Sequence, residues 1–552
     1  KSDLFPVNQM KAVRRGLEVV FGWFSVWLKC SLTSLWRALS AADIWIVWPG
    51  TRGPCKSELE EWKTNEALRH YHRPADESSV TVQTRTHIFH VDLFRLSECS
   101  EYFRALSQSG MRETSESLVQ LDHVSSSVFY HFLEFSFHNR FIVPVKELDA
   151  HIQLFVPPYL ELSSYLLAET FLSECLSVLE GELSPDNCCS YLNLAQEICC
   201  EQLKRAVFAY MSRNMLEMPH LVTGLSGEEK DEIVRLRMEG RQHLCSLRKE
   251  NLTSWNDSET ESARHVFTLE GSEESGSWHP VTELPFRADK WCFTTVVLYN
   301  YLYIIGGYRQ RVRRGWEFKM ASFRFNPFTG TWACTAPLMK HRRHFSAVAC
   351  EGCIYAVGGW YLDSLITPDS NTTLYTAVER YDPWEGRFVS SLPLTDFQFT
   401  MSLSHDIPLT TSHGHCLYVL GSIQRTGEKL LLQYNTKHDS WSELLPTLTR
   451  ADADLPALYF LGATDRLIVI GGNNSESVVT SFCVQSRRWE QVRTAEKVAF
   501  AGQGTLAGDQ ALLMPSIQHN TIIRMDLQTL STRDLPPLPI ATRYEAIFYL
   551  CF

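Results

Sequence analysis

The second half of the chain repeats a short pattern in which apolar residues are followed by two small residues. The four copies read YIIGG at 303–307, YAVGG at 355–359, YVLGS at 418–422 and IVIGG at 468–472. Each apolar run predicts a buried β-strand, and a glycine pair permits a sharp turn where a Cβ atom would clash. The copies are spaced roughly 50 to 60 residues apart, a period that indicates repeated sheet units.

Each copy carries a second anchor, which is an aromatic residue shortly after a further strand and a turn. These aromatic residues are Trp332, Phe388, Trp441 and Trp489. A large ring at this point can fill the gap between neighbouring sheets. The two-part repeat therefore predicts a β-propeller, in which four-stranded sheets are arranged in a ring.

Weaker copies of the pattern extend the prediction to six sheets. A fifth sheet is expected from the strands at 511–514 and 522–526. A sixth is expected to combine strands at 265–269 and 276–280 with a last strand at 544–550. Pairing of strands from the two ends of this region would close the ring and remove both exposed edges.

The first half of the chain shows a different pattern, in which strands and helices alternate. Segments 80–84 and 87–91 alternate apolar and polar residues, as a β-hairpin does. A helix is expected over 96–106, a strand over 118–121 and another helix from Val128. Before these, a short charged helix is expected over 56–70, ending before Pro74, and residues 1–55 are expected to be a poorly ordered extension.

The composition excludes several classes of function. The net charge of −11 argues against general affinity for nucleic acid, which needs a basic face. The apolar stretch 19–28 is too short to cross a bilayer, which needs roughly 20 apolar residues, so no membrane partner is expected. The sixteen cysteines follow no even framework, so we expect buried reduced thiols.

No catalytic constellation stands out in the sequence. It contains no P-loop, no G-x-S-x-G and no H-E-x-x-H motif, so we expect no catalytic residues and no cofactor. The nineteen histidines are scattered, without partners at ligand spacing, so no metal site is expected.

Two basic clusters in this acidic chain are the candidate binding residues for a protein partner. The expected substrate-binding residues are Arg309, Arg311, Arg313, Arg314, Trp316, Lys340 and Arg342. The guanidinium fork suits carboxylates or phosphates, so the partner would carry a short acidic motif. The alternative is that the 309–314 segment is a solvated loop without a binding role.

Several motifs together resemble a known protein family. The sequence Ser100–Phe103 followed by Ser109–Glu113 is similar to the centre of a BTB domain, and 128–141 fits the same family. The segment starting at Leu183-Ser184-Pro185-Asp186 resembles the start of a BACK domain, and the repeats resemble kelch blades. This order resembles the BTB–BACK–kelch (kelch-like) family.

The resemblance implies a multidomain fold with four parts. These are the extension 1–55, an α+β BTB/POZ domain over 56–160, a short all-α BACK domain over 161–262, and an all-β six-bladed kelch propeller over 263–552. The family's BTB domains form homodimers, so a homodimer is expected.

The resemblance also implies a function, which is to recruit protein substrates to a cullin-3 RING ubiquitin ligase as a non-catalytic adaptor in the cytoplasm, with the nucleus as a second compartment. The implied cullin-binding residues are Tyr102, Phe103, Met111 and Glu113. An alternative is that Met111 only packs inside the BTB fold.

The chain departs from the family at Val91-Asp92-Leu93, where the family has an Ala-His-Arg/Lys stretch. The second interpretation is therefore a scaffold that binds cytoskeletal or signalling proteins without any ligase work.

Overall fold

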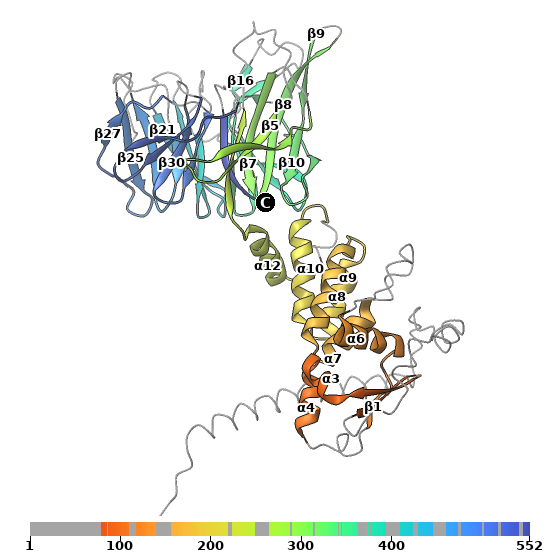
Figure 1. The fold of residues 1–552 in the computed structure, drawn as a ribbon. Helices are drawn as coiled ribbons and strands as arrows, with labels where there is room; N and C mark the ends of the chain where they lie inside the picture. Colours follow the sequence, from red (N-terminus) through yellow and green to blue (C-terminus); the bar gives the residue numbers. More distant parts are fainter. Residues whose placement is uncertain are drawn as a thin grey trace, which may run out of the picture. The chain divides into compact units, whose positions relative to one another are not determined.

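The structure of the chain is a computed structural model (Figure 1). It describes residues 79–85, 87–109, 118–139, 156–218, 224–248, 264–286, 290–312, 315–340, 342–343, 345–362, 372–374, 377–393, 409–422, 429–444, 460–472, 476–499, 502–516, 520–539 and 545–552. The expected extension 1–55 and the helix at 56–70 lie outside these residues. The chain divides into two compact units, Lys1–Ile142 and Val143–Phe552, and each is described by itself.

The first unit contains a three-stranded sheet and three helices in its described part. Strands β1 (Ser79–Thr84) and β2 (Ile88–Asp92) form the expected antiparallel hairpin, and β3 (Leu118–Leu121) pairs with β1 in parallel. Their buried side chains face α6 (Ser126–His138), where the rings of Phe89 and Phe129 meet edge to face at 5.2 Å. This contact forms part of the core of the first unit.

The helix expected over 96–106 is two helices, α3 (Leu93–Cys99) and α4 (Glu101–Ser109). The break lies at Ser100, whose backbone is extended at φ −146° and ψ 124°. Its hydroxyl accepts a hydrogen bond from the amide of Phe103 at 3.4 Å, as an N-cap residue does. The prediction of one helix was wrong because a capping serine interrupts the apolar pattern.

Five helices open the described part of the second unit. They are α7 (Val156–Tyr165), α8 (Glu169–Glu182), α9 (Cys188–Glu197), α10 (Glu201–Arg213) and α12 (Gly227–Met238). Helix α10 packs against α8, α9 and α12. Helix α12 begins at a capping box in which Ser226 and Glu229 satisfy each other's backbone amides.

Six sheets of four or five strands follow in the part of the second unit that the structure describes, together with one small sheet; their strands pair antiparallel except at residues 502–503, which pair in parallel with the last strand. The first sheet contains β7 (Lys290–Leu298), β8 (Tyr301–Val312), β9 (Gly315–Met320), β10 (Ser322–Asn326) and β11 (Thr331–Thr335). The second contains β13 (Ser346–Cys350), β14 (Cys353–Val357), β17 (Ala377–Asp382) and β18 (Arg387–Pro393). The small sheet contains β12 (Arg342–Arg343), β15 (Trp360–Leu362) and β16 (Thr372–Leu374).

The third sheet contains β19 (Leu409–His413), β20 (Cys416–Ser422), β21 (Lys429–Asn435) and β22 (Ser440–Glu443). The fourth contains β23 (Phe460–Ala463), β24 (Leu467–Gly472), β25 (Glu476–Cys483), β26 (Arg488–Trp489) and β27 (Arg493–Glu496). The fifth contains β29 (Thr505–Ala507), β30 (Ala511–Pro515), β31 (Ile522–Asp526) and β32 (Thr532–Asp534). The sixth contains β28 (Gly502–Gln503), β33 (Glu545–Cys551), β4 (Gln242–Arg248), β5 (His265–Glu270) and β6 (Ser277–Glu283).

The aromatic anchors of the repeat lie directly opposite an aromatic residue on the adjacent strand. The four pairs are Phe325 with Trp332, Tyr381 with Phe388, Tyr434 with Trp441, and Phe482 with Trp489. Their ring centroids are 4.9–5.0 Å apart. Trp441 also packs on a cluster shared by the second and third sheets, so the predicted filling of the gap between sheets is observed there.

The first strands of successive sheets contact one another in order around the second unit. Strand β7 contacts β13, β13 contacts β19, β19 contacts β23 and β23 contacts β29. The last strand, β33, contacts both β30 and β7, which returns the order to its start. The strands of these sheets pair antiparallel apart from residues 502–503, and the sheets lie side by side (Figure 1), an arrangement consistent with a propeller.

The sixth sheet combines strands from both ends of this region, as expected. The pairing differs in one respect, because β4 lies between β33 and β5. Strand β4 falls within residues 161–262, where only helices were expected. The segment 161–262 therefore ends inside the sheets and not before them.

Candidate functional site

The 309–316 segment forms a hairpin and not the long loop that the sequence suggested. Strand β8 pairs antiparallel with β9, with Gly307 opposite Met320 and Val312 opposite Gly315. Position 309 lies opposite 318, and position 311 lies opposite Trp316 in this hairpin. Two of the predicted arginines, Arg309 and Arg311, are in β8, whereas Arg313 and Arg314 lie outside the described residues.

The second basic segment lies next to this hairpin, because β12 contacts β8. Lys340, just before β12, is exposed, and its amide donates to a carboxylate oxygen of Glu379 at 3.3 Å. The structure thus brings the two predicted basic segments side by side on one part of the second unit. The two segments belong to different sheets, because β8 is in the first sheet and β12 is in the small sheet.

Arg342 differs from its neighbours, because its side chain is fully buried. Its Nη2 lies 2.8 Å from Oε1 of Glu379, which is also fully buried. Its Nη1 donates to the carbonyl oxygen of Gly358 at 2.9 Å. The prediction that Arg342 contacts a partner was therefore wrong. A carboxylate 37 positions later in the chain takes its charge.

The four predicted cullin-binding residues have different positions. Tyr102 in α4 is half-buried, and Phe103 is fully buried with its ring 5.2 Å from that of Tyr102. Phe103 is therefore a core residue and offers no surface contact, which corrects that prediction. Met111 and Glu113 lie outside the residues that the structure describes.

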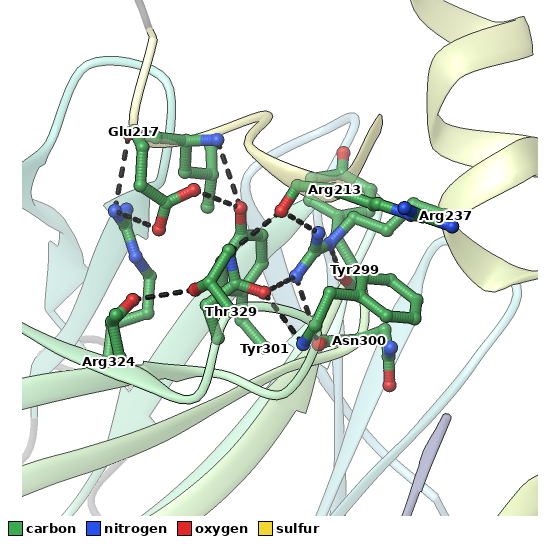
Figure 2. Close-up of polar contacts among 12 residues, drawn as sticks. Arg213, Glu217, Arg237, Tyr299, Asn300, Tyr301, Arg324 and Thr329 are labelled. Atoms are coloured by element: carbon green, nitrogen blue, oxygen red, sulfur yellow. Dashed lines mark hydrogen bonds and ion pairs between the residues drawn. The ribbon is translucent and has the colours of Figure 1, made fainter. Parts of the chain in front are cut away.

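Sequence reasoning missed a buried polar site of the second unit, the joint between its helices and its sheets (Figure 2). Arg237 near the end of α12 is fully buried. Its Nε donates to the carbonyl of Tyr299 at 2.6 Å, and Nη1 donates to the carbonyls of Ser212 and Arg213 at 2.6 and 2.9 Å. One side chain thus holds the end of α10 to the turn between β7 and β8.

The remaining guanidinium donors reach two further acceptors. Nη2 of Arg237 donates to the carbonyl of Asn300 at 3.3 Å and to the side-chain oxygen of Asn326 at 2.9 Å. The guanidinium carbon lies 3.5 Å from the centroid of the Tyr301 ring, as in a cation–π contact. None of the five acceptors is a carboxylate, so the cation is stabilised by carbonyl dipoles and an aromatic face.

A second group of contacts surrounds Tyr301 (Figure 2). The Tyr301 hydroxyl donates to a carboxylate oxygen of Glu217 at 2.7 Å and accepts from the amide of Leu216 at 3.1 Å. Nη2 of Arg324 lies 3.2 Å from the other carboxylate oxygen of Glu217. The segment after α10 is therefore held to strands β8 and β10 by a charged network.

Burial explains the direction of the pKa shifts at the joint. Burial lowers the pKa of Arg237 to about 10, although Tyr301 and Glu217 act in the opposite direction. The group remains a cation at neutral pH. Burial also raises the pKa of Tyr301 above its ordinary value, so its hydroxyl stays protonated and can donate to Glu217.

The joint offers hydrogen bonding but no group arranged for catalysis. In the described ranges, no cluster of three metal-ligating side chains is found, and no helix is long and apolar enough to span a bilayer.

Cys350 and Cys353 form one C-x-x-C pair across a two-residue turn, and burial raises the pKa of Cys350 to about 12 and that of Cys353 to about 11. These are protonated thiols and not ready metal ligands.

Two family profiles match the chain. The BTB/POZ domain profile matches residues 68–183, and the Kelch motif profile matches residues 341–390. The first match continues past residue 160 through α7 and α8. The second match spans β12 to β17 and most of β18.

Three curated relatives have kelch in their names, and one of them also has BTB. Kelch domain-containing protein 7A of Mus musculus is 29% identical over 268 residues, covering 48% of this chain and 30% of that protein. Kelch repeat and BTB domain-containing protein 13 of Homo sapiens is 27% identical, covering 55% of this chain and 60% of that protein. Kelch-like protein 38 of Homo sapiens is 22% identical, covering 68% and 75%.

The matches to the first two relatives span less than two thirds of those relatives' length. One solved structure, titled "Crystal structure of Nidogen/Laminin Complex", matches 56% of this chain and 98% of that chain at 10% identity with a TM-score of 0.37. A likeness this weak carries no argument about fold or function.

Proposed function

Because this chain has a BTB/POZ domain and kelch repeats, as its BTB–kelch relatives do, we propose that it is a substrate-recognition adaptor of a cullin-3 RING ubiquitin ligase. The observation that carries this proposal is that a BTB/POZ match and a set of repeated sheets occur in one chain. The helices between them are fastened to the sheets through Arg237. Such an arrangement can hold two partners on one molecule.

In this proposal, the six sheets are the blades of a closed kelch propeller, and helices α7 to α12 form a BACK domain. The BTB domain would form the homodimer and contact cullin-3 through Tyr102, Met111 and Glu113. A methionine near a glutamate suits an interface that combines apolar and charged contacts. Phe103 would support this surface from the core.

The substrate would bind at the β8–β9 hairpin and the adjacent exposed Lys340. Arg309, Arg311, Arg313 and Arg314, with Trp316, give this region the positive charge that an acidic peptide motif needs. The adaptor would break no bond itself. It would raise the local concentration of the bound substrate near the ubiquitin-charged enzyme in the cytoplasm, and dimerisation would add avidity.

The cullin-3 half of the proposal is tested by titrating the purified full-length chain with purified cullin-3. We expect binding by the native chain, and a loss of at least about tenfold in affinity for the M111A/E113A variant with an unchanged dimer. Absence of binding by a folded native dimer would remove the ligase role.

The substrate half is tested by capture of partners with an R311E/R313E/R314E variant. We expect partner capture to fall while cullin-3 binding stays as in the native chain. A matched control is R488E, which reverses an exposed arginine in β26 of another sheet and should leave capture unchanged. If the triple variant captures partners as fully as the native chain, the hairpin is solvated and does not bind the substrate.

One observation favours the second candidate, a protein-binding scaffold without ligase work. Asp92 and Leu93 stand where the BTB–kelch family has a histidine and an arginine or lysine. The Asp92 carboxylate accepts from the amide of Phe94 at 2.9 Å as the cap of α3. A carboxylate that caps its own helix does not supply the positive charge that the family has at that place in its dimer. Normal dimers that capture partners but never cullin-3 would favour the scaffold.

A further inference from the structure

Arg237 joins three segments that are distant in the sequence. Its acceptors are at the end of α10, in the turn between β7 and β8, and at the end of β10. Ser212 and Arg213 are the last residues of α10, and their carbonyls have no partner within the helix. A cation is favourable at this negative end of a helix, which explains why a buried arginine is stable here without a carboxylate.

The turn that Arg237 holds has an uncommon backbone conformation. Tyr299 and Asn300 have φ values of 51° and 53°, in the left-handed region. For a tyrosine this conformation costs free energy and persists only when the surroundings hold it. The carbonyls of both residues accept from Arg237, so the arginine stabilises the turn in this conformation.

The same turn is connected to two other sheets. The Asn300 side chain exchanges two hydrogen bonds with the backbone of Cys551 in β33, at 2.8 and 2.9 Å. The Tyr299 ring lies 6.2 Å from that of Trp384 in the second sheet. A Cβ atom at Gly352 would lie 2.3 Å from the Tyr299 hydroxyl, so the two turns fit closely. Arg237 is thereby linked to the first, second and sixth sheets.

Strand β8 runs from this turn to the β8–β9 hairpin. It begins at Tyr301, whose ring stacks on Arg237, and ends at Val312 in the hairpin. Twelve residues of strand span roughly 35 to 40 Å. The orientation of the hairpin relative to α10 and α12 is therefore fixed at the Arg237 end.

The covalent connection alone would leave this orientation free. Helix α12 ends at Met238 and β4 begins at Gln242, so Glu239, Gly240 and Arg241 join them. Gly240 has φ +120°, and because a glycine has more allowed backbone conformations than other residues, this connection alone restrains the orientation weakly. Without the guanidinium contacts, the described bonds that still join helices and sheets are those of Tyr301 and Arg324 to the segment after α10 and that of Asn326 to Arg213, which resist rotation about this connection only in part.

We infer that Arg237 is a positioning residue, which fixes the sheets of the second unit in one orientation on helices α10 and α12. Through β8 it also fixes the direction in which the β8–β9 hairpin is presented. The importance of this direction for substrate transfer rests on the proposed adaptor function. The positioning itself does not.

The test measures distances within the full-length chain by pulsed electron paramagnetic resonance. Spin labels are placed at Glu174 in α8 and Lys437 in the β21–β22 turn, both exposed. Genetically encoded ketone side chains carry the labels, because the sixteen cysteines would also react with thiol reagents. The native chain should give one narrow distance distribution.

The R237M variant should give a distribution about twofold wider, because a hinge at Gly240 is released. The control is R235M on the same helix, whose arginine is exposed and paired with Glu232 and Glu239; it should keep the native distribution. Should R237M fail to fold, R237K takes its place, since lysine keeps the charge but lacks the fork that contacts three segments at once.

A native-width distribution in folded R237M, or in R237K, overturns the inference, as does equal broadening in R235M. The measurement uses neither cullin-3 nor a partner protein. An incorrect adaptor role would therefore leave these distances unchanged, and the two proposals can fail separately.

Discussion

Two arginines, Arg342 and Arg237, are completely buried in the described part of the second unit, and their environments differ. Arg342 meets a carboxylate, Glu379, which is itself buried and also accepts from the amides of Met339 and Lys340. Arg237 meets five neutral oxygens and the rings of Tyr301 and Phe328. The first arrangement neutralises the charge within the sheets, whereas the second distributes it over the acceptors that α10, two turns and β10 present.

The difference shows what each arginine can do. Arg342 and Glu379 fasten the segment before β12 to β17, both of which belong to the sheets. Removing one of them leaves a buried charge without its partner. Removing Arg237 leaves no unpaired charge, but several buried carbonyls lose a donor and the helices and sheets lose one of their connections. Arg342 should therefore control stability, and Arg237 should control orientation.

The largest stability effect is expected for R342M. Loss of one member of a buried ion pair typically costs about 3–5 kcal/mol, so the unfolding free energy of the sheets should fall by about that amount. The measurement is denaturant unfolding followed by intrinsic tryptophan fluorescence.

The double variant R342M/E379L is the control for this pair. It replaces both charges with apolar groups and should recover most of the loss. A loss below about 1 kcal/mol in the single variant, or no recovery in the double variant, would contradict the pairing.

The next effect is expected for R237M, which should lower the unfolding free energy of the second unit by about 2–4 kcal/mol. The distinguishing readout is hydrogen exchange, because Asn300 couples the arginine to the last strand. Amides of β33 should lose protection together with those of α12, while β21 in the third sheet should not. Loss confined to α12 would show that the turn holds the last strand without help from Arg237.

A smaller effect is expected for Y301F, which removes one hydroxyl and keeps the ring beneath Arg237. The loss of the bond to Glu217 should cost about 1 kcal/mol. E217A removes the acceptor of Tyr301 and also the ion pair with Arg324, so it should cost more, and the double variant should cost less than the sum, because both changes remove the Tyr301–Glu217 bond. Additive losses would mean that Tyr301 and Glu217 act independently.

The smallest effect on stability is expected for His131 in α6 of the first unit. Burial lowers the pKa of His131, with Glu134 acting in the opposite direction. The folded state thus binds a proton less readily than the unfolded state, so the unfolding free energy should decrease as the pH falls below about 6.5. H131Q should reduce this dependence in denaturant unfolding between pH 7.5 and 5.5. If H131Q leaves the pH dependence of the unfolding free energy unchanged, other groups cause that dependence.

The repeated pattern predicted the sheets because its information is local. Buried runs such as Ile304–Ile305 and the rings at Trp332 and Trp441 are specified by residues within the same repeat. Strand β4 was missed because its partner β33 lies about 300 residues later in the chain, and a short mixed segment after a helix has no distinctive period.

The site was harder to predict, because its contacts join residues far apart in the sequence. Arg237 bonds to residues 62 to 89 positions away on one side and to residues 24 and 25 positions away on the other. Within α12 its only local signal is Ile233, buried one turn earlier on the same face. Arg342 was assigned to the surface because basic residues are usually exposed, a rule that fails when a buried carboxylate is available.

The most direct test of the central claim is a reciprocal capture experiment on the full-length chain, read by quantitative mass spectrometry. The account predicts that M111A/E113A no longer captures cullin-3 but still captures the partners that bind at the β8–β9 hairpin. R311E/R313E/R314E should lose those partners and still capture cullin-3. Loss of both classes in either folded variant, or no cullin-3 with the native chain, would contradict it.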